Sequence, residues 1–256
     1  MDFVEDYTVV DLEMTGLAVK KDKIIEIGAI KVRNGKVVDE YSTLVNPCIK
    51  LDKRIVELTG ITDEMLQDAP KENDTVNKLI EFIGDDVLVG QNINFDYGFI
   101  KQWALNNNVK IDMFYCDTLK IARKMLPAEQ EKNLEALCKY FGISRDNAHR
   151  ALDDAYETMQ VYEKFKEMIS EIPKDDVNYK IIQKCFFPRK FNIKIKKQTP
   201  ATKKQLEQLH RYLDGNHLDE DIKKQIEEQI NWETLTRSEA SRIMDKLYSR
   251  RDVPRL

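Results

Sequence analysis

Two acidic residues lie two positions apart in an otherwise apolar stretch near the start of the chain. Asp11 and Glu13 belong to the run YTVVDLE, whose β-branched residues predict a strand. Residues two apart on a strand share a face, so both carboxylates are expected on one side of a sheet. Burying two unpaired carboxylates is costly, and a divalent cation offsets their charge most simply. The alternative is that both face solvent on an edge strand, and the pair alone favours that alternative.

Three further segments carry polar residues that could join such a site. Asp96 follows a short apolar run and the polar loop QNIN, at the start of a predicted helix, where a carboxylate often has only a capping role. His149 precedes a long predicted helix and Asp154 lies one and a half turns into it, although an isolated histidine there is more often a surface or capping residue. The segment ELTGIT, residues 57–62, could be no more than a helix end followed by a turn. The combination is far more specific than any one segment.

The elements that must position these residues are strands and helices in alternation. Strands are predicted over three ranges at the start: 7–13, 24–33 and 37–45, with a hairpin turn signal at Asn34-Gly35. Helices are predicted at 53–58, 63–67, 73–83, 97–106, 118–125, 133–141 and 150–172, and short strands at 87–89 and 113–116. A strand meander followed by strands separated by helices is typical of a three-layer α/β or α+β domain with a mixed sheet.

Taken together, these segments resemble the DEDDh exonuclease family. The resemblance covers residues 5–168 and includes three exonuclease motifs in order, at family-like separations, together with ELTGIT. Within that family, the chain resembles the proofreading exonucleases of the epsilon-subunit type in bacterial DNA polymerase III. This resemblance implies a ribonuclease H-like α/β domain over residues 1–172, with a mixed five-stranded sheet.

The resemblance also implies a catalytic set. Its five members are Asp11, Glu13, Asp96, His149 and Asp154. The four carboxylates would hold two divalent metal ions, Mg²⁺ or Mn²⁺, with Asp11 bridging them, and hard cations of this kind favour oxygen ligands. His149 would be the general base that takes a proton from the attacking water, and a tyrosine at its position would indicate the DEDDy group. Asp153, the neighbour of Asp154, is expected on the outer face of its helix.

The same resemblance identifies candidate contacts to the substrate. They are Thr15, Gly16, Leu17, Ile61, Asn92 and Phe95, which would hold the terminal 3′-hydroxyl and pack on the last bases. The chain departs from the family pattern at Met14, where relatives often have threonine, and at Gln91, where many have histidine. Neither position is a metal ligand in the family, so the departures concern substrate preference.

The implied activity is hydrolysis from the 3′ end of DNA, single-stranded or frayed, with release of nucleoside monophosphates. Its implied partners are the 3′ end of DNA and a DNA polymerase or a replication or repair protein. One alternative is an RNA-processing exonuclease of the ribonuclease T or oligoribonuclease type, because no residue reports the 2′-hydroxyl. Another is a catalytically silent nucleic-acid-binding module, which the complete catalytic set argues against.

Charge is distributed unevenly along the chain. Residues 1–170 carry 22 basic and 31 acidic side chains, residues 171–198 carry 8 and 3, and residues 199–256 carry 11 of each.

Residues 173–198 form a basic connector containing KCFFPRKFNIKIKKQ, expected to be either a linker packed on the nuclease domain or a clamp for the substrate strand. Residues 199–256 are expected to form a small helical module of unknown role. Its helices are predicted at 201–213, 219–230 and 237–249, with capping boxes at Thr202 and Thr236.

Other features exclude some classes of protein. No apolar run is long enough to span a bilayer. The acidic N-terminus passes at once into a strand, so neither a signal nor a transit peptide is expected, and a cytoplasmic location without a membrane partner follows. The four cysteines form no CxxC pair and have no neighbouring histidines, which argues against a zinc knuckle or a disulfide framework.

Overall fold

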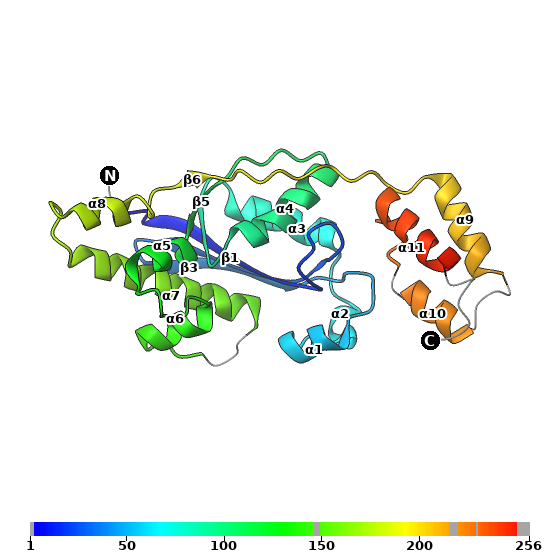
Figure 1. The fold of residues 1–256 in the computed structure, drawn as a ribbon, viewed down its shortest axis with the longest axis horizontal. Helices are drawn as coiled ribbons and strands as arrows, with labels where there is room; N and C mark the ends of the chain where they lie inside the picture. Colours follow the sequence, from blue (N-terminus) through cyan, green and yellow to red (C-terminus); the bar gives the residue numbers. More distant parts are fainter. Residues whose placement is uncertain (1–2, 146–148, 216–219, 229, 250–256) are drawn as a thin grey trace.

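A computed structural model describes residues 3–145, 149–215, 220–228 and 230–249 (Figure 1). Its centre is a six-stranded sheet of order β3-β2-β1-β4-β5-β6. The strands are β1 Asp6–Met14, β2 Ile24–Arg33, β3 Lys36–Leu44, β4 Val87–Gly90, β5 Phe114–Asp117 and β6 Arg189–Lys190. The first three pair antiparallel, β4 and β5 continue parallel to β1, and β6 is antiparallel to β5. The mixed sheet is confirmed, but the predicted number of five strands is wrong.

Helices cover both faces of this sheet. Those packed around the sheet are α1 Lys53–Thr59, α2 Asp63–Leu66, α3 Glu72–Ile83, α4 Asn94–Asn106, α5 Thr118–Met125, α6 Leu134–Phe141, α7 Ala151–Ser170 and α8 Val177–Gln183. Figure 1 shows α3 and α4 on one face and α5, α6 and α7 on the other, which confirms the expected three-layer arrangement. Among the described residues, no helix is long and apolar enough to cross a membrane.

The side chains of β1 alternate between the two cores. Tyr7 and Val9 join the apolar cluster under α7, whereas Val10 and Leu12 join the cluster under α3 and α4. This alternation follows from the two-residue repeat of a strand. Asp11 and Glu13 therefore continue the row that faces α7, at the end of the strand.

The connector, residues 173–198, is packed on the sheet and its helices by its phenylalanines. Phe186 is fully buried in the core under α7. Phe191 stacks on Tyr97 and Tyr115, with ring centroids 3.6 and 4.3 Å apart respectively. Between these two anchors, the two residues of β6 pair with β5 and add the sixth strand. The connector is thus bound along its first part, in agreement with the linker alternative, whereas α8 and β6 were not predicted.

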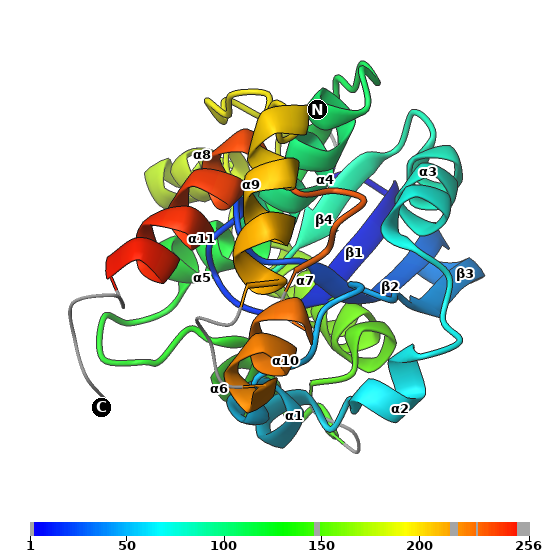
Figure 2. The same cartoon turned by 90° about the vertical axis from the view of Figure 1, so that its right-hand side faces the viewer.

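The C-terminal residues form three further helices around their own apolar cluster. These are α9 Lys203–Leu213, α10 Glu220–Glu228 and α11 Arg237–Ser249. Capping boxes at Thr202 and Thr236 begin α9 and α11, as predicted. Residues 219 and 229, which the sequence also placed in the middle helix, lie outside the described residues. Figure 2 shows that these helices lie in front of one end of the sheet.

Candidate active site

The carboxyl end of β1 meets the first turn of α7. Glu13, His149 and Asp154 come together there, with one potential ligand atom from each within 4.8 Å of the others. Asp154 is buried and lies in the first turn of α7, while the adjacent Asp153 is half-buried. His149 is exposed and adopts a left-handed backbone conformation, with φ of 64°. Ala148, which precedes it in the third motif, lies outside the described residues.

The start of α7 is held in place by β2. The Glu26 carboxylate accepts hydrogen bonds from Arg150 Nε at 3.0 Å and Nη2 at 2.7 Å, and from the Ala151 backbone N–H at 3.0 Å. Glu26 lies directly opposite Glu13 in the β1–β2 ladder. It therefore positions the helix start that carries Asp154. Sequence reasoning missed this residue, although a glutamate inside the apolar strand IIEIGAIKV was a signal that could have found it.

Asp96 reaches the site from α4. This helix begins at Asn94, three residues earlier than predicted, so Asp96 lies in its first turn. Its Oδ1 accepts a hydrogen bond from the backbone N–H of Leu12 at 3.2 Å, which brings it beside β1 between Asp11 and Glu13. Burial raises the pKa of Asp96 to about 7.

The carboxylates repel one another strongly in the absence of a cation. Withdrawal from water, followed by the charges of Asp96, Asp154 and Glu13, holds the pKa of Asp11 well above its usual range. Burial and then the Asp154 charge raise the pKa of Glu13 to about 8. Burial likewise raises the pKa of Asp154. Oxygen donors that resist ionisation together are suited to a divalent cation, which would favour their charged forms.

Arg145 contacts this cluster and was not identified from the sequence. Its Nη2 lies 2.8 Å from Asp154 Oδ1, and its Nε lies 3.1 Å from Glu157 Oε2. All three side chains are largely buried. Burial raises the pKa of Glu157 to about 7 despite the opposing effect of Arg145. Arg145 is thus a buried cation that offsets part of the negative charge beside the site.

The candidate substrate contacts occupy different environments. Leu17 is 82% exposed, whereas Ile61 is 0% exposed in a small cluster with Leu51 and Leu66. Asn92 is exposed, with φ of 58°, and Phe95 is half-buried against Phe99. The structure therefore presents Leu17 and Asn92 at the surface but encloses Ile61 beneath it.

Thr15 and Gly16 lie in a loop closed by hydrogen bonds. The Thr15 backbone N–H donates to Lys23 O at 2.9 Å, and its Oγ1 accepts from the Lys23 N–H at 2.9 Å. A Cβ atom at Gly16 would lie only 2.7 Å from Asp22 Oδ2, which accepts a hydrogen bond from the Ala18 N–H. A larger residue at position 16 would therefore displace the carboxylate of Asp22, which closes the loop next to Glu13.

Comparisons with known proteins agree with this geometry. The RNase_T family model, described as Exonuclease, matches residues 8–162. DNA polymerase III PolC-type of Clostridium perfringens is 40% identical over 176 residues, covering 68% of this chain and 12% of that protein. The chain thus spans a small part of the length of this relative.

Two solved structures have a similar fold. The nuclease domain of 3′hExo, a DEDDh family member bound to rAMP, gives a TM-score of 0.57 at 19% identity and covers 68% of this chain and 98% of that chain. Exonuclease X in complex with 5′ overhanging duplex DNA gives a TM-score of 0.52 at 23% identity, with the same coverage. The expected ribonuclease H-like fold is confirmed. The family match extends over more than half of the residues, and this chain belongs to the RNase_T exonuclease family.

Proposed function

We propose that this exonuclease hydrolyses phosphodiester bonds one at a time from the 3′ end of DNA, using two divalent metal ions, Mg²⁺ or Mn²⁺. The observation that carries the proposal is the convergence of Glu13, His149 and Asp154 within 4.8 Å, at a strand end that also carries Asp11. The complete set makes a catalytically silent module the weaker alternative.

In this proposal the four carboxylates hold the ions. Asp11 lies two residues before Glu13 on the same face of β1, and the charges of Asp96, Asp154 and Glu13 act on it. Glu13 and Asp154 meet at the start of α7, whereas Asp96 comes from α4, which covers the other face of the sheet. Bound ions would supply a lowered pKa for the attacking water and charge stabilisation for the phosphate and the leaving oxygen.

His149 has the position of a general base. Its side chain is exposed at the mouth of the site, while its backbone is held beside Asp154 at the start of α7. An imidazole nitrogen there can accept a proton from the attacking water and pass it to solvent. Replacing His149 with alanine is expected to slow hydrolysis about 10²–10⁴-fold.

The terminal nucleotide would lie between two loops. Thr15, Gly16 and Leu17 would contact it from the loop after β1, and Asn92 and Phe95 from the segment after β4. We assign Ile61 a supporting position beneath this pocket, because it is enclosed and would reach a base only if its loop moved. Contacts of this kind grip an unpaired end by stacking and do not require a particular sequence.

DNA is the favoured substrate, with a polymerase as the favoured partner. The similarity to DNA polymerase III PolC-type supports both, and Exonuclease X binds DNA in its solved complex. Because the 3′hExo nuclease domain was solved with rAMP bound, RNA is included as an alternative substrate in the test.

The test is digestion of single-stranded DNA, 3′-mismatched duplex DNA and single-stranded RNA of the same sequence, with Mg²⁺, Mn²⁺ or EDTA. The proposal predicts metal-dependent release of nucleoside monophosphates, fastest from the DNA substrates. Faster degradation of RNA would reassign the enzyme to the RNA-processing class, and products longer than mononucleotides would contradict the proposal.

A further inference from the structure

A groove separates the loop between β1 and β2 from α11. Figures 1 and 2 both show this loop beside α11, and the groove has a volume of about 230 Å³. Its charged lining comes from both walls: Lys21 and Lys23 from the loop, and Glu239, Arg242 and Lys246 from α11. The three residues of α11 are spaced three and four positions apart, so they share one face of the helix.

The acidic residue in this lining, Glu239, accepts hydrogen bonds at the start of α11. Glu239 Oε2 accepts hydrogen bonds from the Thr236 backbone N–H at 2.9 Å and from Thr236 Oγ1 at 2.6 Å. The groove has four basic side chains and this one carboxylate, so its electrostatic potential is positive.

A second opening, between residues 46–67 of the nuclease body and the end of α10, has the opposite character. It has a volume of about 600 Å³, and its charged lining is mostly acidic: Asp63, Glu64, Glu227, Glu228 and Lys50. A polyanion is attracted by the first opening and repelled by the second. The junction between the nuclease body and the module thus favours one path for a nucleic-acid strand.

The basic groove begins next to the candidate active site. The backbone of Lys23 makes two hydrogen bonds with Thr15, one through its carbonyl and one through its N–H. Thr15 is two residues beyond Glu13 in the chain, and two residues of extended chain span about 7 Å. A strand whose 3′ end reaches Glu13 can therefore continue directly into the groove.

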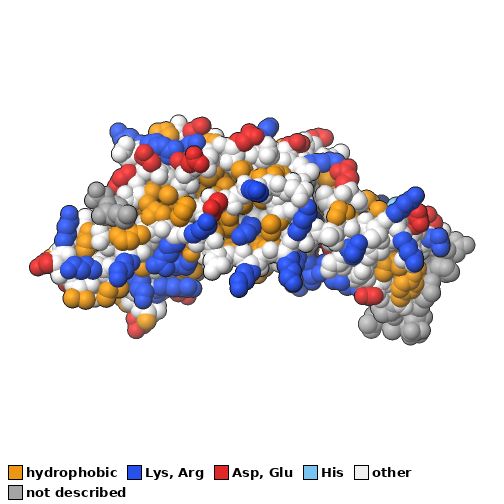
Figure 3. Space-filling view, turned by 90° about the horizontal axis from the view of Figure 1, so that it is seen from above, with side chains coloured by type: hydrophobic (Ala, Val, Ile, Leu, Met, Phe, Trp, Pro, Cys, Tyr) orange, Lys and Arg blue, Asp and Glu red, His pale blue; other side chains and the backbone are white. Residues whose placement is uncertain are grey.

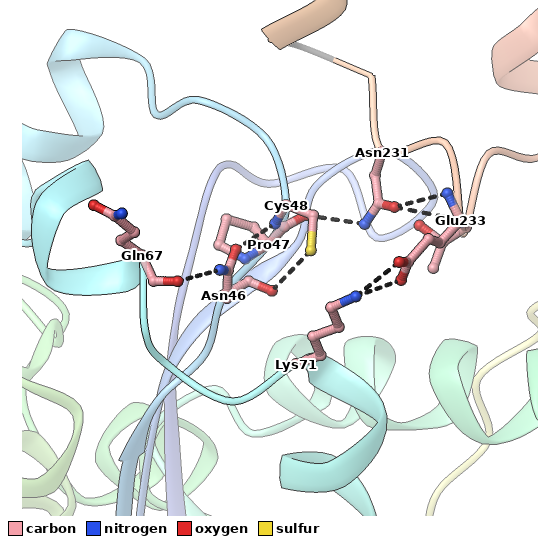
Figure 4. Close-up of polar contacts among 8 residues, drawn as sticks. Asn46, Pro47, Cys48, Gln67, Lys71, Asn231 and Glu233 are labelled. Atoms are coloured by element: carbon pink, nitrogen blue, oxygen red, sulfur yellow. Dashed lines mark hydrogen bonds and ion pairs between the residues drawn. The ribbon is translucent and has the colours of Figure 1, made fainter.

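The wall formed by α11 is attached to the nuclease body by specific contacts (Figure 4). Asn231 Nδ2 donates a hydrogen bond to Pro47 O at 3.1 Å, and Lys71 Nζ lies 2.7 Å from Glu233 Oε2. Before α9, Gln198 Nε2 donates a hydrogen bond to Lys20 O at 2.8 Å. The module is thus held on both sides of the groove.

We propose that this groove binds the phosphodiester backbone of the strand being degraded, upstream of its 3′ end, and that the C-terminal module is a substrate-binding wall. The inference rests on the proposed function, because it requires a nucleic-acid substrate. Lys and Arg side chains bind phosphates without reading bases, which suits an enzyme that removes successive nucleotides.

The test compares two double variants of the full chain. Lys21→Glu with Arg242→Glu reverses one charge on each wall of the groove. Lys36→Glu with Lys78→Glu changes the net charge equally but lies outside the groove, on β3 and α3. Binding of a long single-stranded oligodeoxynucleotide is measured by fluorescence anisotropy in EDTA over a series of salt concentrations, and hydrolysis of a dinucleotide is measured separately with Mn²⁺.

The groove variant is expected to bind the long strand more weakly and with a shallower salt dependence. The slope of log K against log salt should fall by about 0.7 for each phosphate that the groove no longer neutralises. Dinucleotide hydrolysis should be unchanged in both variants, because a dinucleotide is too short to enter the groove. The control variant should keep the wild-type slope. If the groove variant misfolds by circular dichroism, Lys21→Gln with Arg242→Gln replaces it.

A wild-type slope in the folded groove variant would overturn the inference. Failure of the proposed function has a different signature, since it would appear in the wild-type protein itself, as absent hydrolysis, faster degradation of RNA or products longer than mononucleotides. The two results are therefore distinguishable.

Discussion

The backbone of Ala151 runs so close to Gly28 that a Cβ atom at Gly28 would lie 2.1 Å from the Ala151 carbonyl carbon. This approach sets the distance between β2 and the start of α7. Because Gly28 is also paired with Asp11 across the β1–β2 ladder, one small residue allows Asp11 and Asp154 to share a site.

Replacing Gly28 with alanine should therefore displace the start of α7. The added methyl group meets backbone atoms that cannot rotate away, and overpacking of this kind costs about 1–3 kcal/mol. We expect a lower free energy of unfolding in urea and a loss of hydrolysis that exceeds the fraction of unfolded protein.

Gly35→Ala is the matched control. Gly35 lies in the turn after β2, at the opposite end of the strand, with φ of 70°. Alanine there costs about 1–2 kcal/mol in backbone conformation but leaves α7 in place. Equal specific activity of the two folded variants would show that the approach at Gly28 does not position the site.

Removing the Arg145 guanidinium should destabilise the metal-free protein. Asp154 and Glu157 would lose their buried cation, and breaking a buried pair on one side costs about 3–5 kcal/mol. Arg145→Gln is expected to lower the free energy of unfolding by that order in EDTA. Adding Glu157→Gln should recover part of the loss, since one unpaired carboxylate is then removed.

Saturating Mn²⁺ should reduce the effect of Arg145→Gln, because bound ions would stabilise the Asp154 carboxylate. An equal loss with and without Mn²⁺ would indicate that Arg145 is important only for packing.

The stability of the metal-free protein should decrease as pH rises toward neutrality. The pKa of Glu13 rises from an ordinary 4.5 to about 8 on folding. The folded state then retains a proton that the unfolded chain releases, so this contribution to stability falls as pH rises from about 5 to about 8. The melting temperature in EDTA should fall across this window, and the stabilisation by Mn²⁺ should grow.

Glu13→Gln removes this titrating group, so it should reduce the pH dependence in EDTA, with the remainder coming from other carboxyls of raised pKa such as Asp96 and Glu157. A melting temperature that rises across the window in the wild-type protein, or an unchanged profile in the variant, would contradict the assignment.

The sequence patterns predicted most of the strands and helices. They did not predict the contacts that hold the site residues in position. The alternation in β1 and the helical period of α7 place Asp11, Glu13 and Asp154 on elements whose faces are dictated by burial. The role of Glu26 depends on which strand lies beside α7. That is a tertiary contact, and the periodicity of a single strand does not predict it. The same holds for Arg145, whose partners lie in a different element. The strand β6 has two residues, too few to produce an alternating pattern.

We also propose that the connector, residues 173–198, binds the substrate strand as a clamp. Lys194, Lys196 and Lys197 are exposed along its extended second half, although Lys197 also donates a hydrogen bond to Asn108. Figure 3 shows basic side chains gathered along one edge of the face seen from above, over the body and toward the module. Neutralising the three lysines together should flatten the salt dependence of binding and raise KM for long strands, while a dinucleotide substrate is spared. A triple variant with the wild-type salt slope and KM would leave the connector as a linker alone.

The most direct test of the carboxylate site compares two neighbouring residues of α7 on a 5′-labelled single strand with Mn²⁺. Wild-type protein and Asp153→Asn should shorten the labelled strand from its 3′ end in single-nucleotide steps at similar rates. Asp154→Asn should be slower by on the order of 10³-fold or more, about 4 kcal/mol of transition-state stabilisation. If Asp154→Asn keeps more than about a tenth of the wild-type rate, a loss of less than about 1.4 kcal/mol, or if Asp153→Asn is the more severe change, the site assigned at the junction of β1 and α7 is contradicted.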